Sequence, residues 1–176
     1  MSGSTFALRV AQGVGFTGAA WLSGNIAALS ANSVPAIISS VREDNISPNV
    51  ACKQWRNMYE AGKTQNPPIA FATASSFAYV AWSVRQIPRS LAASAAYGGF
   101  GMYVAAAVLT LSIVPYTVAA MRPTNNALLE LAESKGDRVT SSAEVEGLLG
   151  RWTTLNWARS LLPLAGGFAG IAAALL

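Results

Sequence analysis

Four stretches of the chain are long, apolar and free of charged residues. No Asp, Glu, Lys or Arg occurs in residues 10–41, 64–84, 90–121 and 160–176. A helix that crosses a bilayer needs roughly 17–25 mainly apolar residues, and each stretch meets or just reaches that length. A charge at the bilayer centre is costly, so uncharged windows are what lipid requires. We therefore expect four spans, near residues 10–32, 67–85, 97–121 and 155–176.

The spans are expected to be helices. Backbone N–H and C=O groups find no water in hydrocarbon, so only helices or closed barrels cross it. Barrel strands alternate between polar and apolar residues, whereas these stretches are continuous runs rich in Ala, Leu and Gly. The sequence predicts an all-α fold: an integral membrane four-helix bundle that forms a single transmembrane domain over residues 1–176. Recurring glycines should let the helices approach closely, and Pro115 and Pro163 should kink spans three and four.

Composition supports a membrane protein. Charged residues make up 11% of the chain and hydrophobic residues 52%, and the mean hydropathy is +0.37. A soluble domain usually has about 25% charged residues, and its core could give one such window by chance, but four are not expected. The first window is too long for the apolar part of a signal peptide and follows only one basic residue, Arg9, so we interpret it as the first span.

Two longer connections join the spans, loop one near residues 33–66 and loop three near residues 122–154. Loop one contains residues 54–60, a candidate short interfacial helix whose Trp55 and Tyr59 suit the headgroup region. Loop three contains a helix-prone stretch, residues 126–138. A second helical stretch should begin at Ser141, because Ser-Ser-Ala-Glu resembles a capping box.

Basic residues predict the orientation in the membrane. Loops one and three hold eight of the twelve Lys and Arg residues, and the opposite side holds Arg9, Arg85 and Arg89. The positive-inside rule then places both loops in the cytosol and both termini across the membrane. The acceptor Asn45-Ile46-Ser47 would remain unglycosylated in this orientation. The net charge of +4 is spread over the loops, so lipid and not nucleic acid is the expected partner. A homo-oligomer is left open.

Metal and cofactor chemistry has few ligands to use. The chain has no histidine and one cysteine, Cys52, so a zinc, haem or iron site built from the usual ligands is not expected. Cys52 cannot form an intramolecular disulfide, and we expect a spare thiol in a loop. Gly13-x-Gly15-x-x-Gly18 has the letters of a dinucleotide fingerprint but lies inside the first span, so we reject it.

Two polar clusters border loop three. Residues 121–126, Met-Arg-Pro-Thr-Asn-Asn, leave span three, and Trp152, Asn156 and Arg159 enter span four. The second set is spaced i, i+4, i+7 and so shares one helix face. Arg and Asn at the start of a span are costly unless they are paired or face a polar cavity. In the alternative, Arg159 snorkels to the headgroups and Asn156 joins two helices.

These clusters resemble the fungal anthrone oxygenase family. The pattern Arg122-Pro-Thr-Asn-Asn-x-Leu-Leu129 follows the third span, and Trp152-x-x-x-Asn156-x-x-Arg159 leads into the fourth. Loop one contains Trp55-x-x-Met-Tyr-x-x-Gly62, which is similar to the family's first-loop motif. Four spans and the length of the chain also match. The resemblance covers essentially the whole chain.

The resemblance implies oxidation of an anthrone, an aromatic polyketide, to an anthraquinone. It implies molecular oxygen as co-substrate, no metal or flavin, and an endoplasmic reticulum or vesicle membrane. Donors aimed at a developing oxyanion favour an enolate. We assign that role to Arg159 and Asn156, with Asn125 or Asn126 from the facing loop, and expect Trp152 to stack on the substrate.

The remaining candidates are substrate-binding residues: Trp55, Tyr59, Tyr116 and Arg122. Arg122 has an equal alternative, a phospholipid contact at the helix end. The base is open among Tyr59, Glu60, Tyr116 and water.

Two other functions compete with this one. A non-enzymatic tetraspan scaffold or transporter accessory subunit would have no cavity, and its Trp152, Asn156 and Arg159 would pack against neighbouring helices. A cavity on the order of several hundred cubic ångströms between the spans, lined by these three residues and open to the cytosolic side, would favour an enzyme. The third option is another oxidation or cyclisation within the same family, which a substrate screen distinguishes.

Overall fold

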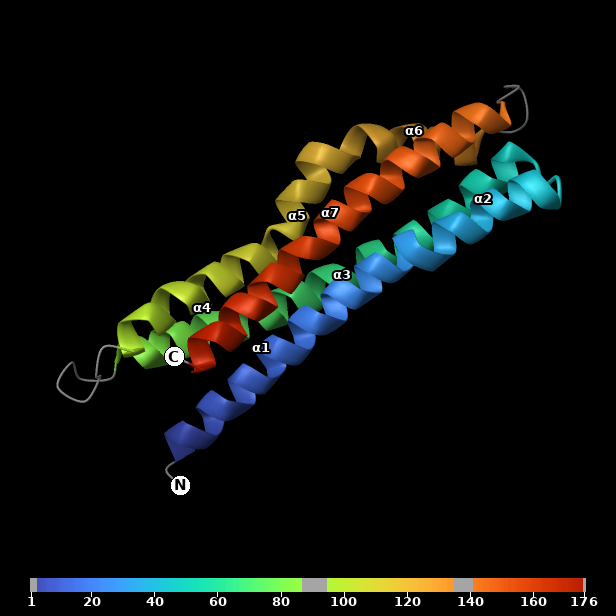
Figure 1. Ribbon diagram of the computed structural model, residues 1–176. Coiled ribbons are helices and arrows are strands. Elements are labelled where there is room, and N and C mark those ends of the chain that lie inside the picture. The colour runs from blue at the N-terminus through green and yellow to red at the C-terminus, as the bar shows by residue number, and fades with distance from the viewer. Residues whose placement is uncertain (1–2, 87–94, 135–140, 176) are drawn as a thin grey trace. The chain divides into compact units, whose positions relative to one another are not determined.

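The computed structural model describes residues 3–86, 95–134 and 141–175, and all regular elements among them are helical (Figure 1). The α-helices are α1 (Gly3–Ala28), α2 (Val34–Glu43), α3 (Pro48–Arg85), α4 (Ala95–Leu111), α5 (Ile113–Tyr116), α6 (Arg122–Glu133) and α7 (Ser142–Leu175). Two short π-helical segments, η1 (Leu29–Ser33) and η2 (Thr117–Met121), stand between them. The predicted all-α class is confirmed for this part of the chain.

Helices α3 and α7, of 38 and 34 residues, are longer than the apolar windows that predicted them. Residues 54–60, predicted as a separate interfacial helix, lie inside α3, which continues through Pro67 and Pro68 to Arg85. A proline removes one backbone donor and usually kinks or ends a helix, but α3 keeps the α-helical state across both. Polar loop one is therefore largely helical.

Loop three contains two helices. α6 ends at Glu133, and the predicted helix-prone stretch extends to Arg138, which lies outside the described residues. α7 begins after Ser141, whose Oγ accepts a hydrogen bond of 3.2 Å from the backbone N–H of Glu144. This is the N-terminal cap that the Ser-Ser-Ala-Glu sequence predicted.

Two of the described helices are long and apolar enough to cross a membrane. They are the run Gly99–Glu133, with a mean hydropathy of 1.9, and Ser142–Leu175, with 1.4. They include most of the third and fourth predicted spans. The first two predicted spans, in α1 and α3, do not reach this apolarity, because Gly, Ser and Thr interrupt their larger apolar residues.

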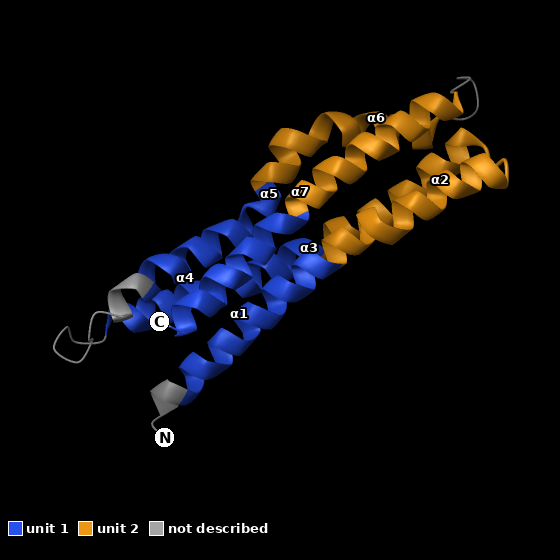
Figure 2. Ribbon diagram, in the orientation of Figure 1, with its two compact units in different colours: residues 1–24, 66–114, 160–176 blue, residues 25–65, 115–159 orange. Residues whose placement is uncertain are grey.

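The chain divides into two compact units (Figure 2). Unit 1 consists of residues 1–24, 66–114 and 160–176, and unit 2 consists of residues 25–65 and 115–159. Helices α1, α3 and α7 contribute residues to both units.

Unit 1 packs segments of α1, α3, α4 and α7 around small side chains. Its buried core includes Phe77, whose ring fills the space left by two glycines: a Cβ added at Gly15 or at Gly170 would lie 2.6 Å from the Phe77 ring. A Cβ at Gly18 would overlap the Thr73 hydroxyl. These glycines therefore permit close helix approach, as the sequence predicted.

Unit 2 has a core of larger side chains. Trp55, Trp152 and Met121 are among its fully buried residues. Cys52 lies in the same core with 0% exposure, so it is not a spare loop thiol. Burial, with a smaller contribution from Glu144, raises the pKa of the Cys52 thiol from its ordinary value of 9.0 to about 11.

Replacing Gly18 by alanine tests the close packing in unit 1. Because the new methyl group must displace Thr73, G18A should lose roughly 1–3 kcal/mol of stability, as overpacked cores do. Its melting temperature in detergent, followed by circular dichroism, should fall by several degrees. The matched control is Gly13→Ala, which meets no atom within 4 Å and should melt at the parent temperature or slightly higher. Equal melting temperatures of the two variants would contradict the close contact between Gly18 and Thr73.

The buried thiol predicts a pH dependence of stability. A raised pKa means that the folded state keeps Cys52 neutral, while the unfolded thiol ionises near pH 9. The contribution of the neutral Cys52 thiol to the free energy of unfolding is complete below pH 9. It is lost as the pH rises toward 11, because only the unfolded thiol ionises in this range. Unfolding measured from pH 8 to 11 should show a steeper decline for the parent than for Cys52→Ala. Parallel pH profiles would show that the thiol is not protected from ionisation.

Candidate active site

A cavity of about 210 Å³ lies in unit 2. α3, η2 and α6 supply its walls, and the lining residues are Tyr59, Thr117, Val118, Arg122, Asn125 and Asn126. Four of these six were predicted from the sequence motifs. The other two, Thr117 and Val118, were missed.

The backbone of η2 forms one wall of the cavity. Both π-helical segments directly precede a helix with a proline in its first turn, Pro35 in α2 and Pro123 in α6. Since proline offers no N–H, the carbonyl one turn earlier cannot make the usual α-helical bond, and the wider π turn is one way to accommodate this. π-Helical turns occur often at functional sites. Here the wide turn carries Thr117 and Val118 to the cavity.

A buried hydrogen bond fixes the orientation of Asn125. The indole Nε1 of Trp152 donates to Asn125 Oδ1 at 3.0 Å. An indole N–H can only donate, so the amide oxygen must face Trp152 and the Nδ2 group must point elsewhere. Among the described residues no acceptor is recorded for Nδ2, and Asn125 lines the cavity. The arrangement presents an oriented N–H donor there.

Three aromatic rings pack together at the cavity, and one of them, Tyr59, lines it. Trp55 stacks on Tyr59, with ring centroids 5.0 Å apart and planes at 12°, and Trp152 meets Trp55 edge-on at 5.9 Å. Both tryptophans are fully buried, while Tyr59 lines the cavity. The stack joins α3 to α7 and holds the Tyr59 ring in place.

Arg159 lies behind the cavity wall. Its Nη1 donates to the Thr117 hydroxyl at 3.1 Å, and its buried Nε has no hydrogen-bond partner among the described residues. Arg159 thus reaches the cavity through a lining residue. Tyr116 is half-buried against the core of unit 2.

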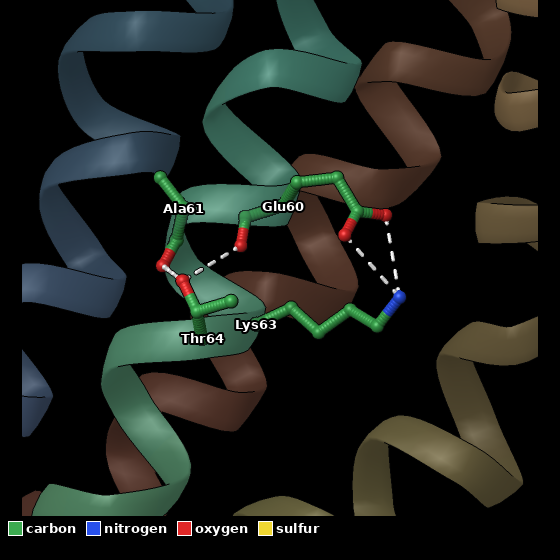
Figure 3. Close-up of polar contacts among 4 residues, drawn as sticks. All are labelled: Glu60, Ala61, Lys63 and Thr64. Carbon is green, nitrogen blue, oxygen red and sulfur yellow. Dashed lines mark hydrogen bonds and ion pairs between the residues drawn. The ribbon is translucent and has the colours of Figure 1, made fainter.

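Glu60 points to a different partner (Figure 3). Its carboxylate pairs with Lys63 Nζ, which is 3.3 Å from each oxygen, and both side chains are partly exposed. Lys63 also lies 5.8 Å from the centre of the Tyr59 ring. Of the three side chains considered as base, only Tyr59 lines the cavity.

Asn156 belongs to a separate contact. Its Nδ2 donates to the backbone oxygen of Ile26 and to Ser30 Oγ, both at 2.8 Å, and Ser30 Oγ donates to Thr153 O at 3.3 Å. The residue is fully buried and does not line the cavity. The structure therefore shows the alternative set out above, in which Asn156 joins two helices.

The sequence contained a weak signal for the residues that it missed. Thr117 and Val118 lie five and four residues before Arg122, about one helical turn, so they share its side of the chain. A threonine within an apolar span ahead of a polar cluster was a usable indication.

The cavity can bind a flat ligand that carries an oxygen anion. Its wall offers the Asn125 amide, the Asn126 amide and the Arg122 guanidinium, and no lining residue is acidic. In the described part of the chain, no group of three His, Cys, Asp or Glu side chains gathers as metal ligands would.

Comparison with known proteins gives the class. A sequence model of the family described as anthrone oxygenase matches residues 55–169. The chain is 39% identical over 175 residues to the anthrone oxygenase encC of Aspergillus fumigatus, covering 92% of this chain and 91% of the relative. It is 32% identical to an anthrone oxygenase of Claviceps purpurea, covering 86% and 82%, and 30% identical to the noranthrone monooxygenase of Aspergillus flavus, covering 86% and 67%. No solved structure matches it significantly.

The matched region includes every residue that lines the cavity, together with Trp55, Trp152 and Arg159. The chain belongs to the anthrone oxygenase family. The resemblance read from the three short motifs is thereby confirmed.

Proposed function

We propose that this protein is a monooxygenase that oxidises an anthrone-type aromatic polyketide to an anthraquinone, with O2 as co-substrate and without a metal or flavin. One observation carries the proposal. The motifs that begin at Trp55 and Arg122 are far apart in sequence, yet both line one cavity in unit 2, and the motif that begins at Trp152 contacts two of its lining residues, Asn125 and Thr117.

The reaction needs little from the protein beyond binding and electrostatics. The central CH2 of an anthrone is flanked by two aryl rings and is vinylogous to a ketone, so loss of a proton gives an electron-rich anthrolate. The anion passes one electron to O2, and the two radicals recombine to form a C–O bond. Protonation gives a hydroperoxide, which loses water to leave the new carbonyl. In total one CH2 and one O2 give one C=O and one H2O.

The cavity supplies a place for the anion. Two groups would donate hydrogen bonds to the anthrolate oxygen, as preorganised donors do. One is the Asn125 Nδ2 group, which the bond from Trp152 orients, and the other is the guanidinium of the lining residue Arg122. Tyr59 offers a ring face for the flat substrate and is the candidate proton acceptor within the cavity. Arg159 acts through Thr117 as a positioning residue.

The size of the cavity suits part of the substrate. Its volume of about 210 Å³ is below the roughly 300 Å³ at which ligand pockets begin. We infer that the reacting ring and its oxygen enter, while the rest of the tricycle lies toward the opening. The cavity is smaller than the one expected of an enzyme, and Trp152, Asn156 and Arg159 do not line it. The choice of an enzyme over a scaffold or accessory subunit therefore rests on the family match.

The surfaces of the units support a bilayer location. Among the residues that the structure describes, twenty large apolar side chains are exposed, and seventeen of these lie in unit 1. Of the twenty charged residues, seventeen lie in unit 2. The two apolar windows that could cross a membrane are only 28% and 33% buried. We infer that unit 1 lies in lipid, that the chain crosses it four times in an endoplasmic reticulum or vesicle membrane, and that loops one and three are cytosolic.

The isosteric variant Asn125→Asp tests the oxyanion donor. It keeps an acceptor for Trp152 but replaces the N–H donor by an oxygen that repels an anion. Removing one preorganised donor typically costs about 100- to 1,000-fold in kcat. N125D should lose rate on this scale when anthrone oxidation is followed as quinone absorbance under O2.

The control for this experiment is Arg151→Gln, because Arg151 is an exposed residue of α7 that does not line the cavity. It should retain the parent rate. A folded N125D enzyme with the parent rate would remove Asn125 from the mechanism. If the parent protein forms no quinone from any anthrone tested, the proposed activity is wrong.

A further inference from the structure

Unit 1 contains a second cavity that the proposed reaction does not use. It has a volume of about 300 Å³ and is lined by residues of α3 and α4. Its lining residues on α3 are Ala78, Ala81, Trp82 and Arg85, and those on α4 are Phe100, Val104, Ala107 and Val108. All of them are apolar except Arg85, at one end.

Arg85 ends α3 without an acidic neighbour. Its guanidinium lies 5.9 Å from the centre of the Phe100 ring, and no ion pair or hydrogen bond of its side chain is recorded among the described residues. The sequence of unit 1 contains no Asp or Glu at all. No acidic side chain of this unit can therefore neutralise the charge. The cavity therefore ends at an exposed cation that no acidic side chain of unit 1 pairs with, and this cation is available to an anion from outside the unit.

The rest of the cavity is an elongated apolar groove. Its lining residues on α3 run from Ala78 to Arg85, which corresponds to about 12 Å along a helix. Ala81 is buried and lies at the bottom of the groove, whereas Trp82 is 58% exposed and Val108 is 61% exposed. An exposed Trp near an Arg at a helix end is typical of a membrane interface.

We propose that this groove binds a glycerophospholipid, with one acyl chain along the groove and the phosphate on Arg85. The proposal rests on the bilayer location inferred above. Charge complementarity selects this occupant, since a phospholipid supplies both an apolar chain and the anion that Arg85 lacks. A neutral aromatic molecule or a second apolar helix would fill the groove and leave the guanidinium unpaired.

Photolabelling of the purified full chain tests the site. The probe is a phosphatidylcholine with a diazirine in one acyl chain, and labelled peptides are mapped by mass spectrometry. Label should concentrate in residues 78–85 and 100–108. Arg85→Gln should lower the amount of label about fivefold, because one Lys or Arg near an anionic lipid surface strengthens binding by about that factor. Ala107→Phe, which fills the groove, should abolish it.

The matched control is Arg9→Gln, which removes the other described cation of unit 1 outside the groove and should leave the label unchanged. Three results would overturn the site: label spread evenly over the exposed apolar faces, equal labelling of the Arg85→Gln variant, or displacement of the label by an anthrone. Anthrone oxidation is measured on the same samples. Oxidation without groove labelling rejects only the lipid site, and labelling without oxidation rejects only the proposed activity.

Discussion

Hydrocarbon cannot hydrate a charge or an unpaired backbone group, and the proposed bilayer location of unit 1 depends on this constraint. Unit 1 carries nearly all of the exposed large apolar side chains and three arginines as its only charged residues. Several of its hydroxyl groups donate within their own helices: Thr73 to Ile69 O, Ser76 to Ala72 O and Thr110 to Ala106 O. A surface of this kind is stable in lipid, where a water-exposed one would aggregate.

Polar chemistry is consequently confined to unit 2. All the residues that line the candidate active site belong to it, as do Arg159 and the Trp152 indole that orients Asn125. The π turn of η2 brings Thr117 into the wall, and the stacked Trp55 and Tyr59 close it on another side. A low-dielectric wall with a few oriented donors suits a reaction whose main requirement is a stabilised aromatic anion.

Much of this could be predicted from sequence because lipid imposes simple patterns. Charge-free windows located the apolar parts of α1, α3, α4 and α7, and two of the three short motifs contain four of the six residues that line the cavity. The predictions that were wrong concern features that depend on tertiary contacts. Nothing local shows that α3 continues through Pro67 and Pro68, or that Asn156 turns toward Ser30 while Asn125, from the other cluster, turns to the cavity. Helical spacing defines a shared face, but the neighbouring helices decide what each residue on it meets.

The exposure of unit 1 to lipid is tested most directly by cysteine labelling in membranes. In a Cys52→Ala background, single cysteines replace Val108 and Leu164 in unit 1, and Val50 and Arg151 in unit 2, all of which are exposed. A water-soluble maleimide in permeabilised vesicles should modify the two unit 2 cysteines and leave the two in unit 1 unmodified until detergent and denaturant are added. Equal modification at all four positions would contradict the account.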